Sequence, residues 1–347
     1  MRKLLYVLFG GILLGCSDHY EGDENIKRIK SEHVKVDRLT DLSQIGIYDV
    51  SGFIKQGNKL LLGSTYMKEG VAQILDLNHL KDEHILSRGN NSSKRLRALS
   101  SFNSYDGTSV TALDFKTGEL IETLVSPLAR GIMKESIIQL PEKEQHLIAV
   151  KTDDFVISIG FYEEGRYLLY SLIDGSVRYC LSYPDFPEYP DLQEKTKGML
   201  YGSSILRVRP DGQAFVCADM YSGVIDFCRL ISDGIERVKL ERLSYPLTEI
   251  SENSVPRVLY KRENRFGFVD IAVTTERVYA LYSGKTYKRD RQGAFEANCL
   301  FEYDWEGNLV RILDFDVALT GITYDSDERM LYGIVGDTGI TLVKLRL

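Results

Sequence analysis

The sequence predicts an all-β protein, a six-bladed β-propeller of four-stranded antiparallel blades whose ring is closed by an N-terminal strand. Beyond residue 30, short β-branched and aromatic runs alternate with turns that contain Gly, Asp or Asn, and helical patterns are scarce. Turn glycines recur at Gly118, Gly175, Gly234 and Gly307, which lie 57, 59 and 73 residues apart. This interval is typical of propeller blades with insertions, and Gly suits each turn because one turn residue needs positive φ.

Six repeating units follow one another along the chain, and each is predicted to be one blade whose third and fourth strands are joined by the glycine turn. The units are residues 46–88, 98–125, 136–182, 202–243, 267–314 and 318–347. The last unit is one strand short. Residues 34–39 are predicted to supply that strand and so to remove the exposed sheet edges. A seven-bladed ring and a large β-sandwich are the alternatives.

The N-terminus has the pattern of a bacterial lipoprotein signal peptide. Arg2 and Lys3 precede an apolar run at residues 4–14, which is too short to cross about 30 Å of hydrocarbon as a permanent helix. Leu13-Leu14-Gly15-Cys16 resembles the lipobox, in which cleavage precedes a cysteine that carries the acyl chains, such as palmitate. We therefore expect residues 1–15 to be removed and Cys16 to be the lipid attachment site. A plain secretory peptide is the alternative.

The rest of the chain is predicted to form a tether and one domain. Residues 16–30 are polar and acidic, so we expect a flexible tether there and the propeller at residues 31–347. The expected location is the cell envelope, lipid-anchored to the outer membrane. Acidic residues after the lipidated cysteine resemble an export signal for the cell surface, and the periplasmic face is the alternative.

The charge of the chain argues against nucleic acid as a partner. The formal net charge is −7, and no Lys/Arg stripe with interleaved aromatic residues is present. The nearest basic cluster, residues 94–97, is short and lies among serines and asparagines, so we interpret it as a solvated loop.

Four cysteines follow the signal region: Cys180, Cys217, Cys228 and Cys299. None forms a C-x-x-C pair, and the histidines lie far from them in sequence, so no zinc-type spacing appears. Cys217 and Cys228 flank a turn-like segment. They are expected either to form a disulfide across a hairpin or to be buried free thiols.

Several segments together resemble the TolB-like six-bladed propeller lipoproteins of Gram-negative envelopes. The most telling are residues 266–284 (FGFVDIAVTTERVYALYSG) and 301–309 (FEYDWEGNL), with further support from residues 183–184, 209–212, 323–325 and 331–334. The resemblance spans most of the mature chain and implies the fold and the envelope location. Residues 88–95 (RGNNSSKR) depart from the Gly/Pro-rich segment that often follows the first blade in such proteins.

No catalytic motif is present in the sequence: HExxH, GxSxG, Walker A and a GxGxxG after a strand are all missing. We therefore expect no enzyme and no cofactor. The alternative is a lactonase-like hydrolase or lyase with a divalent metal on the central axis, held by scattered groups such as Asp49, Asn103 and Asp270. These three residues are otherwise interpreted as polar groups of turns and strand edges.

A binding role fits the architecture better, because a propeller gathers loops from every blade around one opening. The candidate ligand-binding residues are Arg130, Tyr201, Arg265, Phe266 and Tyr282. Their side chains offer planar apolar faces with polar edges, although the same residues could pack the blades. Residues 183–190, rich in Pro and aromatics, are either a docking arm or a stiff connector. We expect a non-enzymatic binding or scaffolding module for a protein or carbohydrate partner.

Overall fold

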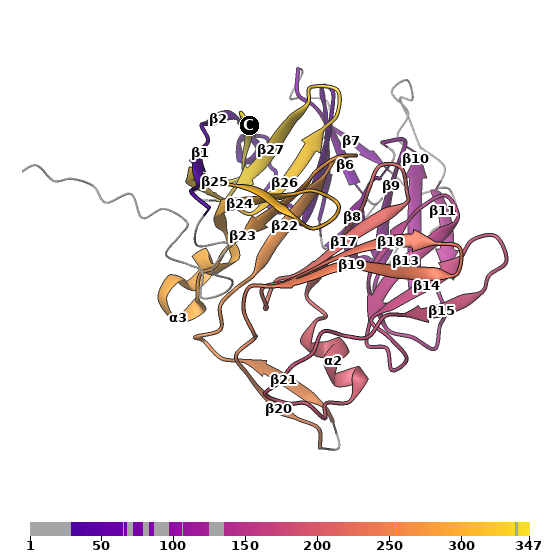
Figure 1. Ribbon diagram of the computed structural model, residues 1–347. Coiled ribbons are helices and arrows are strands. Elements are labelled where there is room, and N and C mark those ends of the chain that lie inside the picture. The colour runs from indigo at the N-terminus through magenta and orange to yellow at the C-terminus, as the bar shows by residue number, and fades with distance from the viewer. Residues whose placement is uncertain are drawn as a thin grey trace, which may run out of the picture.

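The computed structural model describes residues 29–64, 66–67, 72–78, 83–86, 97–105, 107–124, 135–253, 255–336 and 339–347. Within them, six four-stranded antiparallel blades form a propeller, as the sequence predicts (Figure 1). The first strand of each blade lies innermost, and these strands contact one another in the order β3, β8, β12, β16, β22, β26 and back to β3.

The strands of blade 1 are β3 (Gly52–Gln56), β4 (Lys59–Gly63), β6 (Ala72–Asp76) and β7 (Glu83–Leu86). Those of blade 2 are β8 (Arg97–Asn103), β9 (Ser109–Asp114), β10 (Glu119–Leu124) and β11 (Glu135–Gln139), and the short β5 (Tyr66–Met67) pairs with β8. Those of blade 3 are β12 (His146–Lys151), β13 (Phe155–Gly160), β14 (Tyr167–Ser171) and β15 (Val177–Cys180).

The strands of blade 4 are β16 (Ser204–Val208), β17 (Ala214–Asp219), β18 (Val224–Ile231) and β19 (Gly234–Arg242). Those of blade 5 are β22 (Phe268–Val273), β23 (Val278–Tyr282), β24 (Ala297–Tyr303) and β25 (Leu309–Leu319). Those of blade 6 are β26 (Gly321–Asp325), β27 (Met330–Val335), β28 (Thr341–Leu345) and β2 (Val36–Asp41).

The N-terminal strand closes the ring, which confirms the prediction for residues 34–39. β2 pairs antiparallel with the C-terminal β28, from Val36 opposite Leu345 to Asp41 opposite Thr341, with an irregularity between Arg38 and Thr40. Just before it, β1 (Glu32–His33) adds to blade 5 by parallel pairing with β25. The two ends of the propeller therefore meet in one blade, and Figure 1 shows the C-terminus beside β2.

The predicted units were wrong in two places. β11 pairs with β10, so residues 135–139 are the fourth strand of blade 2, whereas the sequence placed residues 136–139 in the following unit. Gly118 joins the second and third strands of its blade, while Gly175, Gly234 and Gly307 do join third and fourth strands. All four glycines have positive φ, between 68° and 146°, as the turn chemistry required.

Apolar layers between neighbouring blades hold the ring together. In β23, Val278, Ala280 and Tyr282 pack toward blade 4, while Tyr279 and Leu281 pack toward blade 6. Successive strand residues point to opposite faces, and here both faces are covered, so every residue of β23 is buried. This explains why the strands are nearly continuous apolar runs rather than alternating ones.

One group of connections extends beyond the blades. Helix α2 (Glu194–Leu200) and the hairpin of β20 (Thr248–Ser251) and β21 (Arg257–Tyr260) contact each other at one end of the molecule (Figure 1). Tyr183 and Phe186 are buried in the apolar cluster beneath them. The segment at residues 183–190 is thus packed against the body of the protein through these two aromatic side chains.

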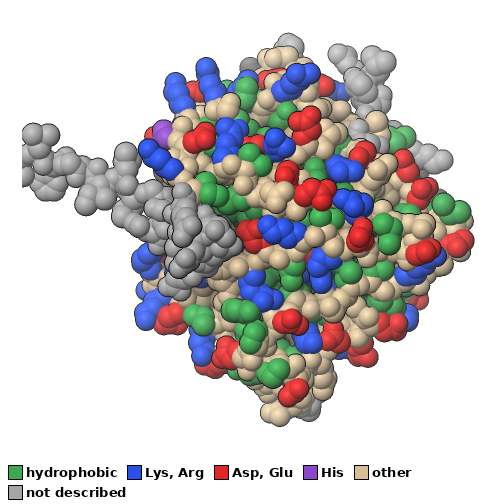
Figure 2. Space-filling model, viewed as in Figure 1, with side chains coloured by type: hydrophobic (Ala, Val, Ile, Leu, Met, Phe, Trp, Pro, Cys, Tyr) green, Lys and Arg blue, Asp and Glu red, His purple; other side chains and the backbone are tan. Residues whose placement is uncertain are grey.

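The remaining helical segments of the described residues are short: η2 (Leu42–Ile45), α3 (Tyr287–Asp290) and η3 (Arg291–Phe295). In the ranges that the structure describes, no helix combines the length and the hydropathy needed to cross a membrane. On the face seen in Figure 2, acidic and basic side chains are interspersed rather than segregated.

Candidate functional site

A cavity of about 820 Å³ lies where the inner strands surround the propeller axis. It opens among the turns that join the first and second strands of the blades, with Gly107, Pro210, Glu276 and Asp327 at these turns. We call it the axial cavity. Its size is that of a typical small-ligand site, and its lining is rich in polar groups.

Arg207 lies on the axis and joins three blades. It comes from β16, where Leu206 and Val208 are buried toward blade 3 and Arg207, on the other face of the strand, reaches toward blade 5. Its Nη1 donates to Asn103 Oδ1 of blade 2 (2.9 Å), and its Nη2 donates to Asp270 Oδ1 of blade 5 (3.0 Å). One guanidinium thus binds blades 2, 4 and 5 across the channel.

Asp270 extends this network to blade 6. Asp270 Oδ2 accepts a hydrogen bond from the Ile322 amide at 2.9 Å. Asp270 Oδ1 accepts a hydrogen bond from the amide of the next residue, Ile271, at 2.8 Å. A Cβ at position 321 would lie 3.2 Å from Asp270 Oδ2, so Gly321 leaves room for this approach. Burial raises the pKa of Asp270, against the opposing effect of the Arg207 charge.

The three residues named as possible metal ligands do not form one ligand set. Asn103 and Asp270 do converge on the axis, but the Oδ1 atoms of both accept hydrogen bonds from Arg207. A cation between them would face a fixed positive charge. Asp49 is exposed and bonds to the hydroxyl of Ser64. Over the described part of the chain, no group of three or more His, Cys, Asp or Glu is placed to hold a metal ion.

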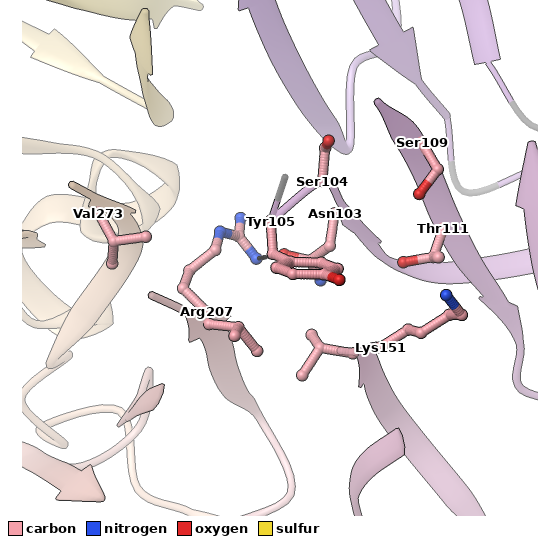
Figure 3. A pocket seen from close by; sticks show the side chains of 10 residues that line it. Asn103, Ser104, Tyr105, Ser109, Thr111, Lys151, Arg207 and Val273 are labelled. Atoms are coloured by element: carbon pink, nitrogen blue, oxygen red, sulfur yellow. Dashed lines mark hydrogen bonds between the residues drawn. The ribbon is translucent and has the colours of Figure 1, made fainter. Parts of the chain in front are cut away.

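A small recess of about 30 Å³ opens between blades 2 and 3 beside the axial cavity (Figure 3). Asn103, Tyr105 and Arg207 line both spaces, so the recess is a side chamber of the cavity. Thr111 of β9 and Lys151 of β12 form part of its wall.

The polar groups around the recess are mostly held in place by neighbours. Lys151 Nζ lies 3.0 Å from Glu122 Oε1, and the Tyr105 hydroxyl donates to Asp153. The Thr111 side chain is the exception: it is only 5% exposed, and within the described residues its hydroxyl has no hydrogen-bond partner.

The predicted ligand-binding residues that the structure describes, Tyr201, Arg265, Phe266 and Tyr282, do not line the axial cavity. Phe266 packs on Phe295, with ring centroids 4.7 Å apart, and Tyr282 stacks on Phe301 at 5.1 Å. Tyr201 is 3% exposed and follows α2. In the structure these three side chains pack within the fold, and a ligand-binding role for them stays a prediction.

Three further sequence predictions can be placed. Arg265 donates from Nη1 to the carbonyl oxygen of Gly284 at 2.7 Å, which ties it to a neighbouring loop. Cys16, Arg130 and the loop at residues 88–95 lie outside the described residues. Cys217 and Cys228 are buried free thiols, each paired across the sheet with another residue, so the disulfide alternative is wrong in this structure.

Sequence reasoning missed Arg207, Tyr105 and Thr111. A charged residue inside the apolar strand at residues 204–208 was an available signal for Arg207. Tyr105 and Thr111 offered none, because alternation along a strand shows which residues share a face but not which face borders the axis.

Several solved structures are similar in fold. A Bacteroides fragilis protein described as exported has a TM-score of 0.51 at 9% identity, covering 94% of this chain and 96% of that one. The Cps50 β-propeller domain of Myceliophteria thermophila has a TM-score of 0.42 at 13% identity, with 89% and 99% covered. A Bacteroides uniformis protein described as a 6-phosphogluconolactonase has 0.41 at 13%, with 77% and 71% covered.

The sequence comparisons identify the family. No curated protein matches the chain. The family model for TolB-like six-bladed propellers matches residues 112–327, which is more than half of the chain and covers blades 3, 4 and 5 completely. The chain therefore belongs to the TolB-like six-bladed propeller family.

Proposed function

We propose that this protein is a non-enzymatic binding module of the bacterial envelope, which receives part of a protein or carbohydrate partner in its axial cavity. The observation that carries the proposal is the cavity itself: about 820 Å³, lined from several blades by polar groups on a rigid ring. A preformed site of this kind loses little conformational entropy on binding.

Binding is favoured over catalysis by the state of the buried charged groups in the cavity. Arg207 is paired with Asp270 at 3.0 Å, and Lys55 with Asp325 at 2.8 Å. Of the residues that line the cavity within the described ranges, none is a His or Cys. A general base or nucleophile needs a group that is free to exchange a proton or attack, and these paired charges are not. The two carboxylates of the described lining, Glu276 and Asp327, lie at exposed turns, where water keeps them solvated.

The experiment is a pull-down from detergent-solubilised cells, with proteins and glycans both identified in the eluate. Ser326→Trp places a large ring at an exposed turn on the cavity wall, and Ser232→Trp places it at an exposed turn elsewhere. We expect Ser326→Trp to lose the partner and Ser232→Trp to retain it. A partner retained by both variants would show that the axial cavity is not the binding site.

The envelope location is the second part of the proposal. It is supported by the TolB-like family and by the N-terminal pattern that ends at Cys16. Acyl chains on Cys16 would hold the protein on the outer membrane, since each buried methylene contributes about 0.8 kcal/mol.

Membrane fractionation after labelling with an alkyne analogue of palmitate tests the anchor. We expect label on the wild type, and a soluble unlabelled product from Cys16→Ala. Protease treatment of intact cells then distinguishes the surface from the periplasmic face. An unlabelled wild-type protein would overturn the lipid anchor.

A further inference from the structure

We infer that the axial cavity binds an uncharged oligosaccharide and that the recess at Thr111 receives one of its hydroxyl groups. This inference rests on the proposed function and names the class of ligand. It selects carbohydrate over protein from the pairing of the buried charges, the size of the recess and the hydroxyl side chain that faces into it.

The charges of the walls favour an uncharged ligand. Among the described residues, four cations line the cavity or the recess, and the three that are less than a quarter exposed each have a carboxylate partner: Arg207 with Asp270 at 3.0 Å, Lys55 with Asp325 at 2.8 Å and Lys151 with Glu122 at 3.0 Å. The fourth, Arg329, lies in solvent at an exposed turn, as do the carboxylates of Glu276 and Asp327. A charged ligand would have to lose its hydration and compete with these partners. Hydroxyl groups need no such compensation, because they both donate and accept hydrogen bonds.

The recess matches a hydroxyl group in size and chemistry. Its volume of about 30 Å³ suits a single water-sized group, and it opens directly into the axial cavity. Thr111 is 5% exposed as a residue, and Figure 3 shows its side chain facing the recess, where its hydroxyl makes no hydrogen bond to another described residue. A ligand hydroxyl that enters the recess would give this hydroxyl a hydrogen-bond partner, and such a bond contributes about 0.5–1.5 kcal/mol.

A second donor lies beside Thr111. The Lys151 ammonium carries three N–H groups, and its recorded contact with Glu122 uses one of them. A ligand hydroxyl in the recess can thus donate to Thr111 Oγ1 and accept from Lys151 Nζ. Both directions of hydrogen bonding are therefore available to one hydroxyl group.

Aromatic side chains supply the apolar part of the site. Tyr105 and Tyr324 both line the axial cavity. The Tyr105 hydroxyl is fixed by Asp153, and the Tyr324 ring is stacked on Tyr279 with centroids 6.2 Å apart and planes at 15°. Held rings of this kind present flat faces on which the C–H surface of a sugar ring packs. The cavity volume accommodates more than one sugar unit.

The test is a glycan array of neutral hexose oligosaccharides and their uronic-acid counterparts, followed by calorimetry on the tightest neutral probe. We expect neutral probes to bind more tightly than acidic ones. Thr111→Val keeps the shape but removes the hydroxyl, and we expect it to weaken binding at least tenfold. A probe that lacks the hydroxyl seated in the recess should bind wild type and Thr111→Val equally.

The matched control is Thr123→Val. Thr123 is a fully buried residue of the same blade whose hydroxyl also lacks a partner among the described residues, but it lines neither the cavity nor the recess. Binding should be unchanged in this variant. Unchanged binding in Thr111→Val, or tighter binding of the acidic probes, would overturn the inference.

The two proposals can fail separately. If a protein partner is lost in Ser326→Trp and no glycan binds, the proposal of a binding module is supported and the inference of an oligosaccharide ligand is overturned. Ligand binding that is insensitive to Ser326→Trp would overturn the axial cavity as the site and the sugar assignment with it.

Discussion

Arg207 and Asp270 face each other across the propeller axis, with Nη2 and Oδ1 3.0 Å apart and both side chains largely buried. The aspartate also holds the Ile322 amide, so the pair joins blades 4, 5 and 6. Loss of this pair would remove a link between three blades and would release the Arg207 side chain, which lines the axial cavity.

We therefore expect Asp270→Asn to destabilise the fold, because it leaves the guanidinium of Arg207 without a counter-charge. The pair retains some exposure, 22% and 14%, so we expect a loss of about 2–3 kcal/mol, below the range for a fully buried pair. Urea denaturation followed by circular dichroism measures it. Asp233→Asn, at an exposed turn, is the control. Equal losses in the two variants would contradict the prediction.

Lys55 makes a second buried bridge, between blades 1 and 6. Its Nζ lies 2.8 Å from Asp325 and 2.6 Å from Glu328, and 4.2 Å from the centre of the Tyr332 ring. Lys55→Met would leave Asp325, 1% exposed, as a buried unpaired charge, and we expect a loss of about 3–5 kcal/mol.

Thermal unfolding by calorimetry checks this prediction, with the exposed Lys116→Met as the control. The double variant Lys55→Met/Asp325→Leu should regain much of the lost stability, since it removes the unpaired charge. If Lys55→Met melts at the same temperature as Lys116→Met, the bridge does not contribute as described.

Asp219 gives the fold a pH dependence. Burial raises the pKa of this carboxyl from 3.8 to about 6, although the amides of Tyr221 and Ser222 donate to it. The folded state then binds a proton more tightly than the unfolded state. This group therefore makes the free energy of unfolding fall as pH rises from about 4 to about 6, and its effect is constant above that window.

We expect Asp219→Asn to remove this contribution. Across pH 4 to 6 the wild type should lose on the order of 3 kcal/mol more than the variant, at about 1.4 kcal/mol per pKa unit. Urea denaturation at a series of pH values measures both curves. Parallel curves would mean that Asp219 does not titrate in this range.

The thiols of Cys217 and Cys228 should be inaccessible but reduced. Both are buried, and burial raises the pKa of each, which makes the reactive thiolate scarce. We expect a maleimide to leave them unmodified in the native protein and to modify both in urea without any reductant. A requirement for reductant, detected by peptide mass spectrometry, would indicate a disulfide instead.

The sequence was informative about the ring and much less so about the site. The closing strand could be predicted because the last unit lacked a strand and residues 34–39 had the right pattern. β11 was misassigned because residues 125–134 separate it from β10, and sequence distance does not show where a strand pairs. Arg207, Asn103 and Asp270 lie far apart in the chain, and only the closure of the ring brings them together.

The placement of β1 has a mechanical consequence. Any pull on the chain before Ile29 reaches β1 first, where Val34 N–H donates to the Asp314 carbonyl at 2.8 Å and the His33 ring bonds the Asp314 side chain. These contacts belong to blade 5, whereas the closing strand β2 belongs to blade 6. A force on the N-terminal segment therefore acts on blade 5 before it reaches β2, the strand that completes blade 6. The pairing of β1 with blade 5 thus protects the closure of the ring.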